Sequence, residues 1–292
     1  MKCLDEIITL NKKKGKKLLI VCGVHGNETS AVASVVELKK DIKLLKLKNI
    51  SSIRFMIGVN ETGILYNTRE YVNVSDNGGN DLNRLFQKDD GLSRKNEIIL
   101  SIKNAVSNSD YVIDVHASPF IKNCVTIDYD ENVGYLDNFF RLNNIFHVIR
   151  NTASNNTLKK YACSKGKIGI TAEINGMGFS SNLILNVNFI KSIIDSLDGI
   201  GKKDITTYST AFQKEIGLNS ISFDIFSKKE GIIKYVNLKD DILGRYPAKA
   251  VIAYIYDYHD NLIDTVEAPC LGTLYAVSEN LIGTTIGMFQ PD

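Results

Sequence analysis

The segment KLLIVCGVHGNE, Lys17 to Glu28, joins an apolar run to two polar side chains. Its first half is a continuous apolar run, which is typical of a strand buried on both faces in a parallel sheet. Its second half carries a histidine and a carboxylate three positions apart, His25 and Glu28. Polar residues at the carboxyl end of a buried strand can form a ligand-binding site.

The chain alternates between apolar runs and helical periodicity up to about residue 207. The further strands that these runs predict cover 52–59, 111–115, 124–129 and 168–173. The helices that the periodicity predicts cover 29–45, 94–106, 135–146 and 182–197. Such alternation predicts an α/β fold, with a mainly parallel, mixed sheet and helices on both faces. An Asn- and Gly-rich loop is expected at 60–84, and loops of this length tend to be functional.

The pattern of the sequence changes past about Thr206. Short alternating runs follow one another, separated by Gly, Pro, Asp and Asn. This pattern is typical of a small all-β module. We therefore expect two domains, a catalytic α/β domain over 1–207 and an all-β C-terminal domain over 208–292.

The composition describes an ordinary soluble protein of 292 residues, with 44% apolar residues and a formal net charge of +2. No basic field indicates nucleic-acid binding, and no apolar stretch is long enough to predict a membrane span. The N-terminus carries Asp5 and Glu6 and does not resemble a signal peptide. The five cysteines form no CxxC pair, which indicates a reducing compartment, so we expect a cytoplasmic protein.

Four expected strand ends deliver polar residues. They are His25 with Glu28, the segment Asp81–Arg84, His116 and Glu173. Parallel strands place these ends at one edge of the sheet, where ligands bind. Two histidines and a carboxylate form a catalytic zinc set with an open position, and a separate carboxylate can activate water. Each feature alone also has a structural explanation, such as a histidine whose hydrogen bonds are made within the core, a salt bridge or a helix cap. Their joint arrangement predicts a zinc site.

The ordered motifs resemble the succinylglutamate desuccinylase/aspartoacylase family, a branch of the zinc carboxypeptidase superfamily. They are GVHGNE at 23–28, NDLNRLF at 80–86, DVHAS at 114–118 and AEING at 172–176. The resemblance covers about 17–200 and implies a zinc-carboxypeptidase-like fold. The C-terminal domain is similar to the biotinyl/lipoyl-like β module of deacylase-type members. A carrier role is not expected there, because the sequence AKA at 248–250 is predicted to lie inside a strand.

The resemblance implies that His25, Glu28 and His116 bind one Zn²⁺ ion. It further implies that Glu173 is the base that takes a proton from the metal-activated water and returns it to the leaving amine.

The same resemblance assigns residues around the metal. Asn83 and Arg84 would hold the substrate carboxylate, for which a planar guanidinium is well suited. Asp81 would orient a ligand histidine through its second ring nitrogen. Arg69 would donate to the oxyanion, although the segment that follows it departs from the spacing of aspartoacylase. Asp114 and Arg150 could also line the pocket, and nothing in the sequence decides their roles.

These features predict a zinc-dependent amidohydrolase that removes an acyl group from an N-acylated amino acid or a related small amine. One alternative is a metallocarboxypeptidase that acts on a peptide or a peptidoglycan stem, because both reactions cleave an amide next to a carboxylate. Another is a non-catalytic binding module on the same scaffold. The sequence carries no recognisable motif for the acyl group, the amine, the oligomeric state or the role of the β module.

Overall fold

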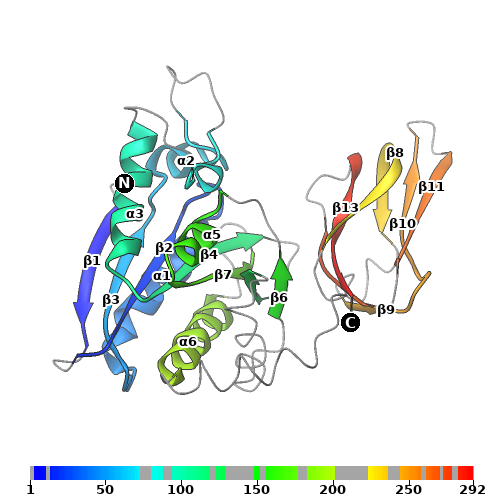
Figure 1. Ribbon diagram of the computed structural model, residues 1–292. Coiled ribbons are helices and arrows are strands. Elements are labelled where there is room, and N and C mark those ends of the chain that lie inside the picture. The colour runs from blue at the N-terminus through cyan, green and yellow to red at the C-terminus, as the bar shows by residue number, and fades with distance from the viewer. Residues whose placement is uncertain are drawn as a thin grey trace.

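The computed structural model describes residues 3–10, 14–72, 80–87, 94–118, 123–128, 148–151, 156–176, 183–200, 223–235, 244–257, 261–269, 272–277 and 282–291. Within these ranges the chain forms a seven-stranded sheet and a six-stranded sheet (Figure 1). The seven-stranded sheet belongs to the α/β part of the chain, and the six-stranded sheet is the small all-β part.

The seven-stranded sheet has the order β1-β3-β2-β4-β7-β5-β6. Its strands are β1 (Leu4–Thr9), β2 (Lys16–Cys22), β3 (Ile50–Ile57), β4 (Tyr111–Ser118), β5 (Cys124–Asp128), β6 (Val148–Asn151) and β7 (Ile168–Asn175). The central strands β3, β2, β4 and β7 are parallel, whereas β1 runs antiparallel to β3 and β5 antiparallel to β7. The expectation of a mainly parallel, mixed sheet is therefore confirmed.

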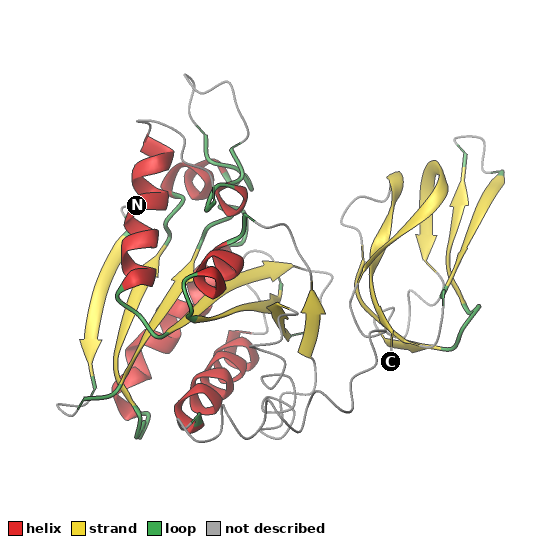
Figure 2. Cartoon of the chain, in the orientation of Figure 1, coloured by secondary structure: helices red, strands yellow, loops and turns green. Residues whose placement is uncertain are grey.

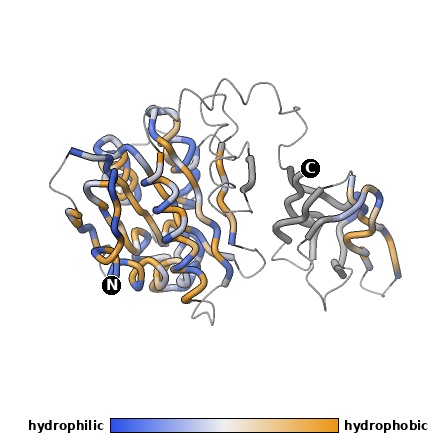
Figure 3. The backbone as a smooth tube through the Cα atoms, turned by 90° about the horizontal axis from the view of Figure 1, so that it is seen from below, coloured by the Kyte–Doolittle hydropathy of each residue, from blue (hydrophilic) through white to orange (hydrophobic). Residues whose placement is uncertain are grey.

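Helices cover both faces of this sheet (Figure 2). On one face lie α1 (Thr29–Asp41) and α6 (Leu183–Gly199). Their apolar sides pack against every second residue of the central strands. On the other face lie α3 (Arg94–Ser107) and α5 (Leu158–Ser164). Apolar segments accordingly run through the interior of this part (Figure 3). The two cores explain why the central strands read as continuous apolar runs.

Several elements differ from the sequence-based expectation. The expected loop at 60–84 contains a helix, α2 (Glu61–Tyr66), and a 3-10 helix, η2 (Leu82–Arg84), so a loop without structure is wrong there. The helix expected at 29–45 ends at Asp41 and continues as a 3-10 turn, η1 (Ile42–Leu44). The helix expected at 135–146 lies outside the described residues.

One carboxylate ties α6 to the start of β3. Asp198, in the last turn of α6, accepts hydrogen bonds from the backbone N–H groups of Lys48, Asn49 and Ile50, each at 2.7 Å. Three backbone donors on one buried side chain hold the entry to β3 in place. The contact therefore links the helical layer to the sheet.

The six-stranded sheet has the order β11-β10-β8-β13-β12-β9, and its strand pairs are antiparallel. Its strands are β8 (Phe223–Tyr235), β9 (Gly244–Tyr246), β10 (Val251–Tyr256), β11 (Leu262–Glu267), β12 (Gly272–Val277) and β13 (Ile282–Pro291). An all-β C-terminal module is thus present. The expected domain boundary at 207/208 lies outside the described residues and stays a prediction.

The prediction that AKA at 248–250, with Lys249 at its centre, lies inside a strand is wrong. The residue lies in a turn before β10 with φ at 67°, and the N–H of Ala250 bonds to the carbonyl of Pro247 at 3.1 Å. The likeness of this module to a biotinyl/lipoyl domain stays a prediction. Among the helices of the described residues, none has both the length and the hydropathy that crossing a membrane requires.

Candidate metal centre

The turn after β2 brings backbone against backbone. Gly23 has φ at 74°, and a Cβ atom there would lie 2.9 Å from the Cα of Gly58. At Gly26 a Cβ atom would lie 2.0 Å from the carbonyl carbon of Gly63 in α2. Such contacts leave no room for a side chain, which explains the two glycines of GVHGNE. The close packing sets the position of His25, between them in the sequence.

Asn60 holds this turn from the end of β3. Its side chain is fully buried, and its Nδ2 donates to the carbonyl of Val24 at 3.1 Å. The carbonyl of Arg69 accepts from the N–H of Gly26 at 3.2 Å and from Asn60 Nδ2 at 3.4 Å. The main chain of Arg69 is therefore held beside the turn that carries His25.

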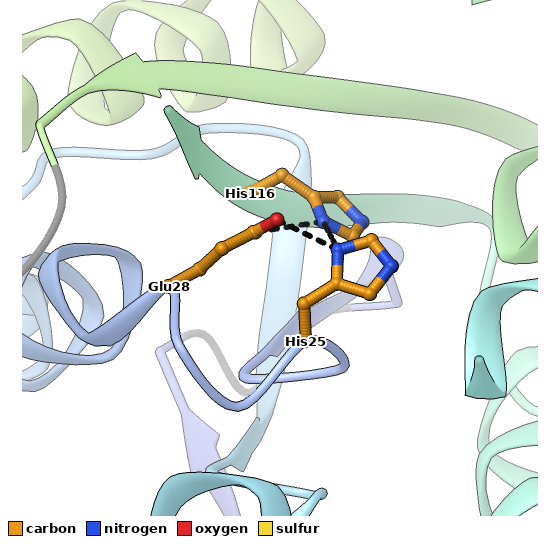
Figure 4. A group of neighbouring side chains, drawn as sticks. All are labelled: His25, Glu28 and His116. Atoms are coloured by element: carbon orange, nitrogen blue, oxygen red, sulfur yellow. Dashed lines mark hydrogen bonds and ion pairs between the residues drawn. The ribbon is translucent and has the colours of Figure 1, made fainter. Parts of the chain in front are cut away.

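His25, Glu28 and His116 meet at the carboxyl edge of the sheet (Figure 4). Nδ1 of His25 lies 2.7 Å from Glu28 Oε1, and Nδ1 of His116 lies 2.9 Å from Glu28 Oε2. The two Nδ1 atoms are 3.0 Å apart, and the three residues are only 3–6% exposed. The main-chain N–H of Ala117 also donates to Glu28 Oε2 at 2.9 Å. Two segments that are far apart in the chain, the turn with His25 and Glu28 and the strand with His116, thus meet at one point.

The donor set fits a divalent cation. Ligand atoms around a tetrahedral zinc ion lie about 3.3 Å apart, given zinc–ligand distances of about 2.0–2.1 Å. One ligand atom from each of the three residues lies within 4.8 Å of the others. Two ring nitrogens and a carboxylate oxygen are also the atom types that zinc binds. These residues therefore fit Zn²⁺ by spacing and by chemistry.

The far nitrogen of each imidazole faces a carboxylate. Nε2 of His25 lies 3.2 Å from Asp81 Oδ1, and Nε2 of His116 lies 2.9 Å from Asp114 Oδ2. When Nε2 carries the proton and donates it to the carboxylate, Nδ1 keeps its lone pair for a cation. Asp81 contacts the second ring nitrogen of His25, and its role in orienting that histidine stays a prediction. The role of Asp114 was left open, although two residues of spacing on a strand put Asp114 and His116 on one face.

Charge favours a cation at this point. Burial would raise the pKa of the Glu28 carboxyl, but His116 and His25 outweigh that effect and hold the pKa well below its usual range. Burial would lower the pKa of His116, but Asp114 and Glu28 raise it well above its ordinary value. The cluster therefore favours a positive charge between its side chains, which a cation can supply.

Glu173 lies beside the cluster on the neighbouring strand. It pairs with His116 in the parallel register of β4 and β7, so both side chains share one face of the sheet. Cys124 on β5 lies opposite Glu173 in the antiparallel register. The pKa of Glu173 is raised, chiefly by burial, although His116 opposes the shift. The position and the raised pKa suit a group that accepts and returns a proton.

Arg69 and Arg84 are both exposed. The side chain of Arg69 is 47% exposed, and its Nη1 lies 3.5 Å from Glu28 Oε1. Its Nε lies 3.5 Å from Asp81 Oδ2. Arg84 is exposed, and its Nη1 donates to the carbonyl of Asn83 at 3.0 Å. Arg69 therefore lies beside Glu28 and Asp81, and the roles of both arginines in binding a substrate stay predictions.

Comparison with known families identifies the relatives of this chain. Residues 14–190 match the family model of the succinylglutamate desuccinylase/aspartoacylase catalytic domain. The chain belongs to the succinylglutamate desuccinylase/aspartoacylase family. The matched range contains His25, Glu28, His116 and Glu173, and it leaves out the six-stranded sheet. Among curated proteins, no sequence matches the chain.

Solved structures share the fold over both sheets. A succinylglutamate desuccinylase/aspartoacylase from Rhodobacter sphaeroides has a TM-score of 0.70 at 14% identity, covering 99% of this chain and 89% of its own. An aspartoacylase family protein from Mesorhizobium loti has a TM-score of 0.70 at 17% identity, covering 98% and 89%. The product-bound ectoine utilization protein EutE (DoeB) from Ruegeria pomeroyi has a TM-score of 0.69 at 13% identity, covering 98% and 88%. At these identities the likeness shows the fold.

Asn83 is buried beside His116 and Asp114. The residue is 6% exposed, and its Nδ2 lies 3.3 Å from Asp114 Oδ2 and 3.1 Å from His116 Nε2. Its Oδ1 accepts the N–H of Leu158 at 2.9 Å. A role in holding the substrate carboxylate stays a prediction, but both ends of this amide already contact the protein.

Proposed function

We propose that this chain is a zinc-dependent amidohydrolase that removes an acyl group from an N-acylated amino acid or a related small amine. The observation that carries the proposal is the buried cluster of His25, Glu28 and His116 with Glu173 in register beside it. The name of the family joins a desuccinylase with an acylase, which supports a deacylation. The two exposed arginines add binding groups for an anionic substrate.

His25, Glu28 and His116 would hold the zinc ion. When bound, the ion supplies a Lewis acid that polarises the amide carbonyl and lowers the pKa of a water molecule. Asp81 and Asp114 keep the proton of each imidazole on Nε2, so that both Nδ1 atoms face the ion. The protein thereby supplies a negatively charged binding site for the ion.

Glu173 would act as the general base and then as the general acid. Its carboxylate takes the proton of the attacking water as the oxygen bonds to the carbonyl carbon. It then delivers that proton to the nitrogen as the carbon–nitrogen bond breaks, which yields a carboxylic acid and a free amine. A raised pKa assists both steps, because it brings the carboxyl closer to the pH at which the protein works.

The arginines would bind the substrate at two places. Arg84 is exposed and can take the carboxylate of an amino acid through two parallel hydrogen bonds. Arg69 can donate to the oxyanion that forms when water adds to the carbonyl, and the loss of such a donor costs about 3–4 kcal/mol of transition-state stabilisation. Its present neighbours, Glu28 and Asp81, already keep the guanidinium at the site.

A metal and activity assay tests the proposal. The protein is purified, its metal content is measured, and N-acetyl and N-succinyl amino acids are assayed with and without a chelator. Hydrolysis should disappear on metal removal and return with zinc. Full activity after rigorous metal removal would contradict the proposal. Unblocked dipeptides belong in the same panel, because their cleavage in place of N-acyl amino acids would indicate a carboxypeptidase instead.

A matched pair of variants tests the base. Glu173→Gln should keep the zinc content and lose activity by about 10²–10⁴-fold, the usual contribution of a general base. The control is Glu37→Gln, because Glu37 lies on α1 and bonds to Lys40 at the surface. The control should retain full activity. Equal activity in both variants would exclude Glu173 as the base. A wild-type protein that binds zinc and turns over none of the substrates would favour a binding module.

A further inference from the structure

We propose that Asn60 is a positioning residue for the reaction, which sets where Arg69 stands relative to the metal ligands. The inference rests on the proposed function, in which Arg69 donates to the oxyanion. Asn60 is the N-terminal cap of α2 and is 0% exposed. It would therefore act through the main chain of Arg69 and not by contact with a substrate.

The side-chain amide of Asn60 has a partner for each of its groups that donate. The backbone N–H of Gly63 requires an acceptor, so the amide atom 2.9 Å from it is the oxygen Oδ1. The other end is then Nδ2, which carries two N–H groups. It lies 3.1 Å from the carbonyl oxygen of Val24 and 3.4 Å from that of Arg69. Because both carbonyls can only accept, each takes one N–H of the amide.

The two carbonyls belong to two different parts of the site. Val24 directly precedes the metal ligand His25 in the chain. The carbonyl of Arg69 also accepts the N–H of Gly26, on the other side of that ligand, at 3.2 Å. One buried side chain thus bonds to the main chain beside the ligand and to the main chain of the arginine. It fixes the separation of these two stretches.

Arg69 depends on its main chain because its side chain is held weakly. The side chain is 47% exposed, and its ion pairs with Glu28 and Asp81 are both 3.5 Å long. Solvent screens ion pairs of such exposed groups, so they contribute little to position. A donor to an oxyanion must lie about 2.7–3.1 Å from that oxygen. The backbone from which the guanidinium extends therefore decides whether it meets this distance.

The turn that carries His25 keeps other bonds when the amide is removed. The main-chain N–H of Asn60 donates to the carbonyl of Gly23 at 2.9 Å, and this bond does not involve the side chain. Nδ1 of His25 also lies 2.7 Å from Glu28 Oε1. Loss of the amide should therefore change turnover more than it changes zinc affinity.

Two variants separate the cap of α2 from the two donors. Asn60→Ser keeps a side-chain oxygen that can cap the helix and removes both N–H donors. Asn60→Ala removes the donors and the cap together. A double-mutant cycle with Arg69→Ala then measures whether Asn60 acts through the arginine. The readouts are kcat and KM at saturating zinc, and the zinc dissociation constant by competition with a chromophoric chelator.

Asn60→Ser should lower kcat about 10–100-fold, because a displacement of about 1 Å at a reacting group costs up to about 100-fold. KM and the zinc dissociation constant should stay within about threefold of wild type, because the affected interaction is made in the transition state. Asn60→Ala should lower kcat to the same extent and lower the midpoint of urea unfolding further. In the Arg69→Ala background, Asn60→Ser should lower kcat by no more than about twofold.

Two control variants match the change in chemistry and the change in stability. Asn108→Ser makes the same substitution at an exposed asparagine, whose Nδ2 also donates to a backbone carbonyl at 2.9 Å. Asp198→Ala removes a stabilising contact at the start of β3, which is the opposite end of that strand. Both controls should keep the wild-type kcat.

An equal loss of kcat from Asn60→Ser in the wild-type and Arg69→Ala backgrounds would overturn the inference. A wild-type kcat in Asn60→Ser, or in Arg69→Ala alone, would also overturn it. So would a rise in the zinc dissociation constant as large as the loss of kcat.

Should both Asn60 variants fail to fold by circular dichroism, hydrogen exchange of the Asn60 side-chain amide in the wild-type protein decides. Slow exchange is expected for a buried and bonded amide, and exchange at the rate of a solvated amide would overturn the inference. A wild-type protein without zinc-dependent hydrolysis would instead contradict the proposed function, so the two failures are distinguishable.

Discussion

Replacing Asp114 with Asn removes a buried negative charge beside the proposed zinc site and keeps the size of the side chain. The bond between Asp114 Oδ2 and His116 Nε2 is 2.9 Å long and lies in a fully buried place. A hydrogen bond to a charged group contributes about 1.5–3 kcal/mol, and a neutral one about 0.5–1.5 kcal/mol. Asp114→Asn should therefore remove about 1–1.5 kcal/mol of the interaction that holds the ring.

At about 1.4 kcal/mol for each factor of ten, the zinc dissociation constant should rise about 5–10-fold. Asp81→Asn is the matched control, because Asp81 makes the same kind of contact to His25. That contact is longer, at 3.2 Å, and the Asp81 side chain is 20% exposed. Solvent weakens such an interaction, so the expected change is only about two- to threefold.

The assay is competition for zinc with a chromophoric chelator, at one pH and one ionic strength for all three proteins. Circular dichroism establishes that the variants are folded. The expected order of zinc affinity is wild type, Asp81→Asn and then Asp114→Asn. The reasoning is refuted if Asp81→Asn weakens zinc binding more than Asp114→Asn does, or if Asp114→Asn leaves it unchanged.

Three further predictions concern pH and stability. Zinc affinity should fall as pH falls through neutrality, because the pKa of His116 is raised and zinc must displace the proton from this histidine. Competition with a chelator at a series of pH values measures this change. Gly26→Ala should destabilise the fold by about 1–3 kcal/mol in urea unfolding, since its Cβ would lie 2.0 Å from a backbone carbon of α2, and should lower zinc affinity. In the control Gly166→Ala, φ is +70° and no atom lies within 4 Å of the new Cβ, so about 1–2 kcal/mol of backbone strain and unchanged zinc affinity are expected. Asp198→Ala should cost about 2–4 kcal/mol of unfolding free energy, because three backbone N–H groups, of which that of Ile50 is buried, lose their acceptor. Zinc affinity should stay at the wild-type value, and a loss below about 1 kcal/mol would contradict the role of this carboxylate.

Much of the α/β sheet could be predicted because its central strands are buried on both faces. The apolar runs that became β2, β3 and β4 need no partner to be recognised. The edge strand β1 escaped prediction, because its two acidic residues are adjacent and Ile8 is its one buried residue. Edge strands owe their structure to a neighbour, and in this sheet the neighbour is β3.

The short helices beside the site were also missed, for a different reason. α2 and α5 are 6 and 7 residues long, so periodicity has little length in which to show. Both are capped by side chains, Asn60 and Thr157, which accept a backbone N–H of the first turn. Those caps are the signal in the sequence that could have indicated them.

The sequence by itself determined which atoms are available to a cation. An imidazole and a carboxylate after one strand, an imidazole on a second and a carboxylate on a third follow from local patterns, because side-chain alternation and strand ends involve neighbouring residues. The tertiary structure decided which nitrogen of each histidine faces inward, which carboxylate holds the other, and that Asn83 lies beside His116. These outcomes depend on strand order, register and close backbone packing, which join residues 25, 83 and 116 across the fold. No local pattern contains those distances.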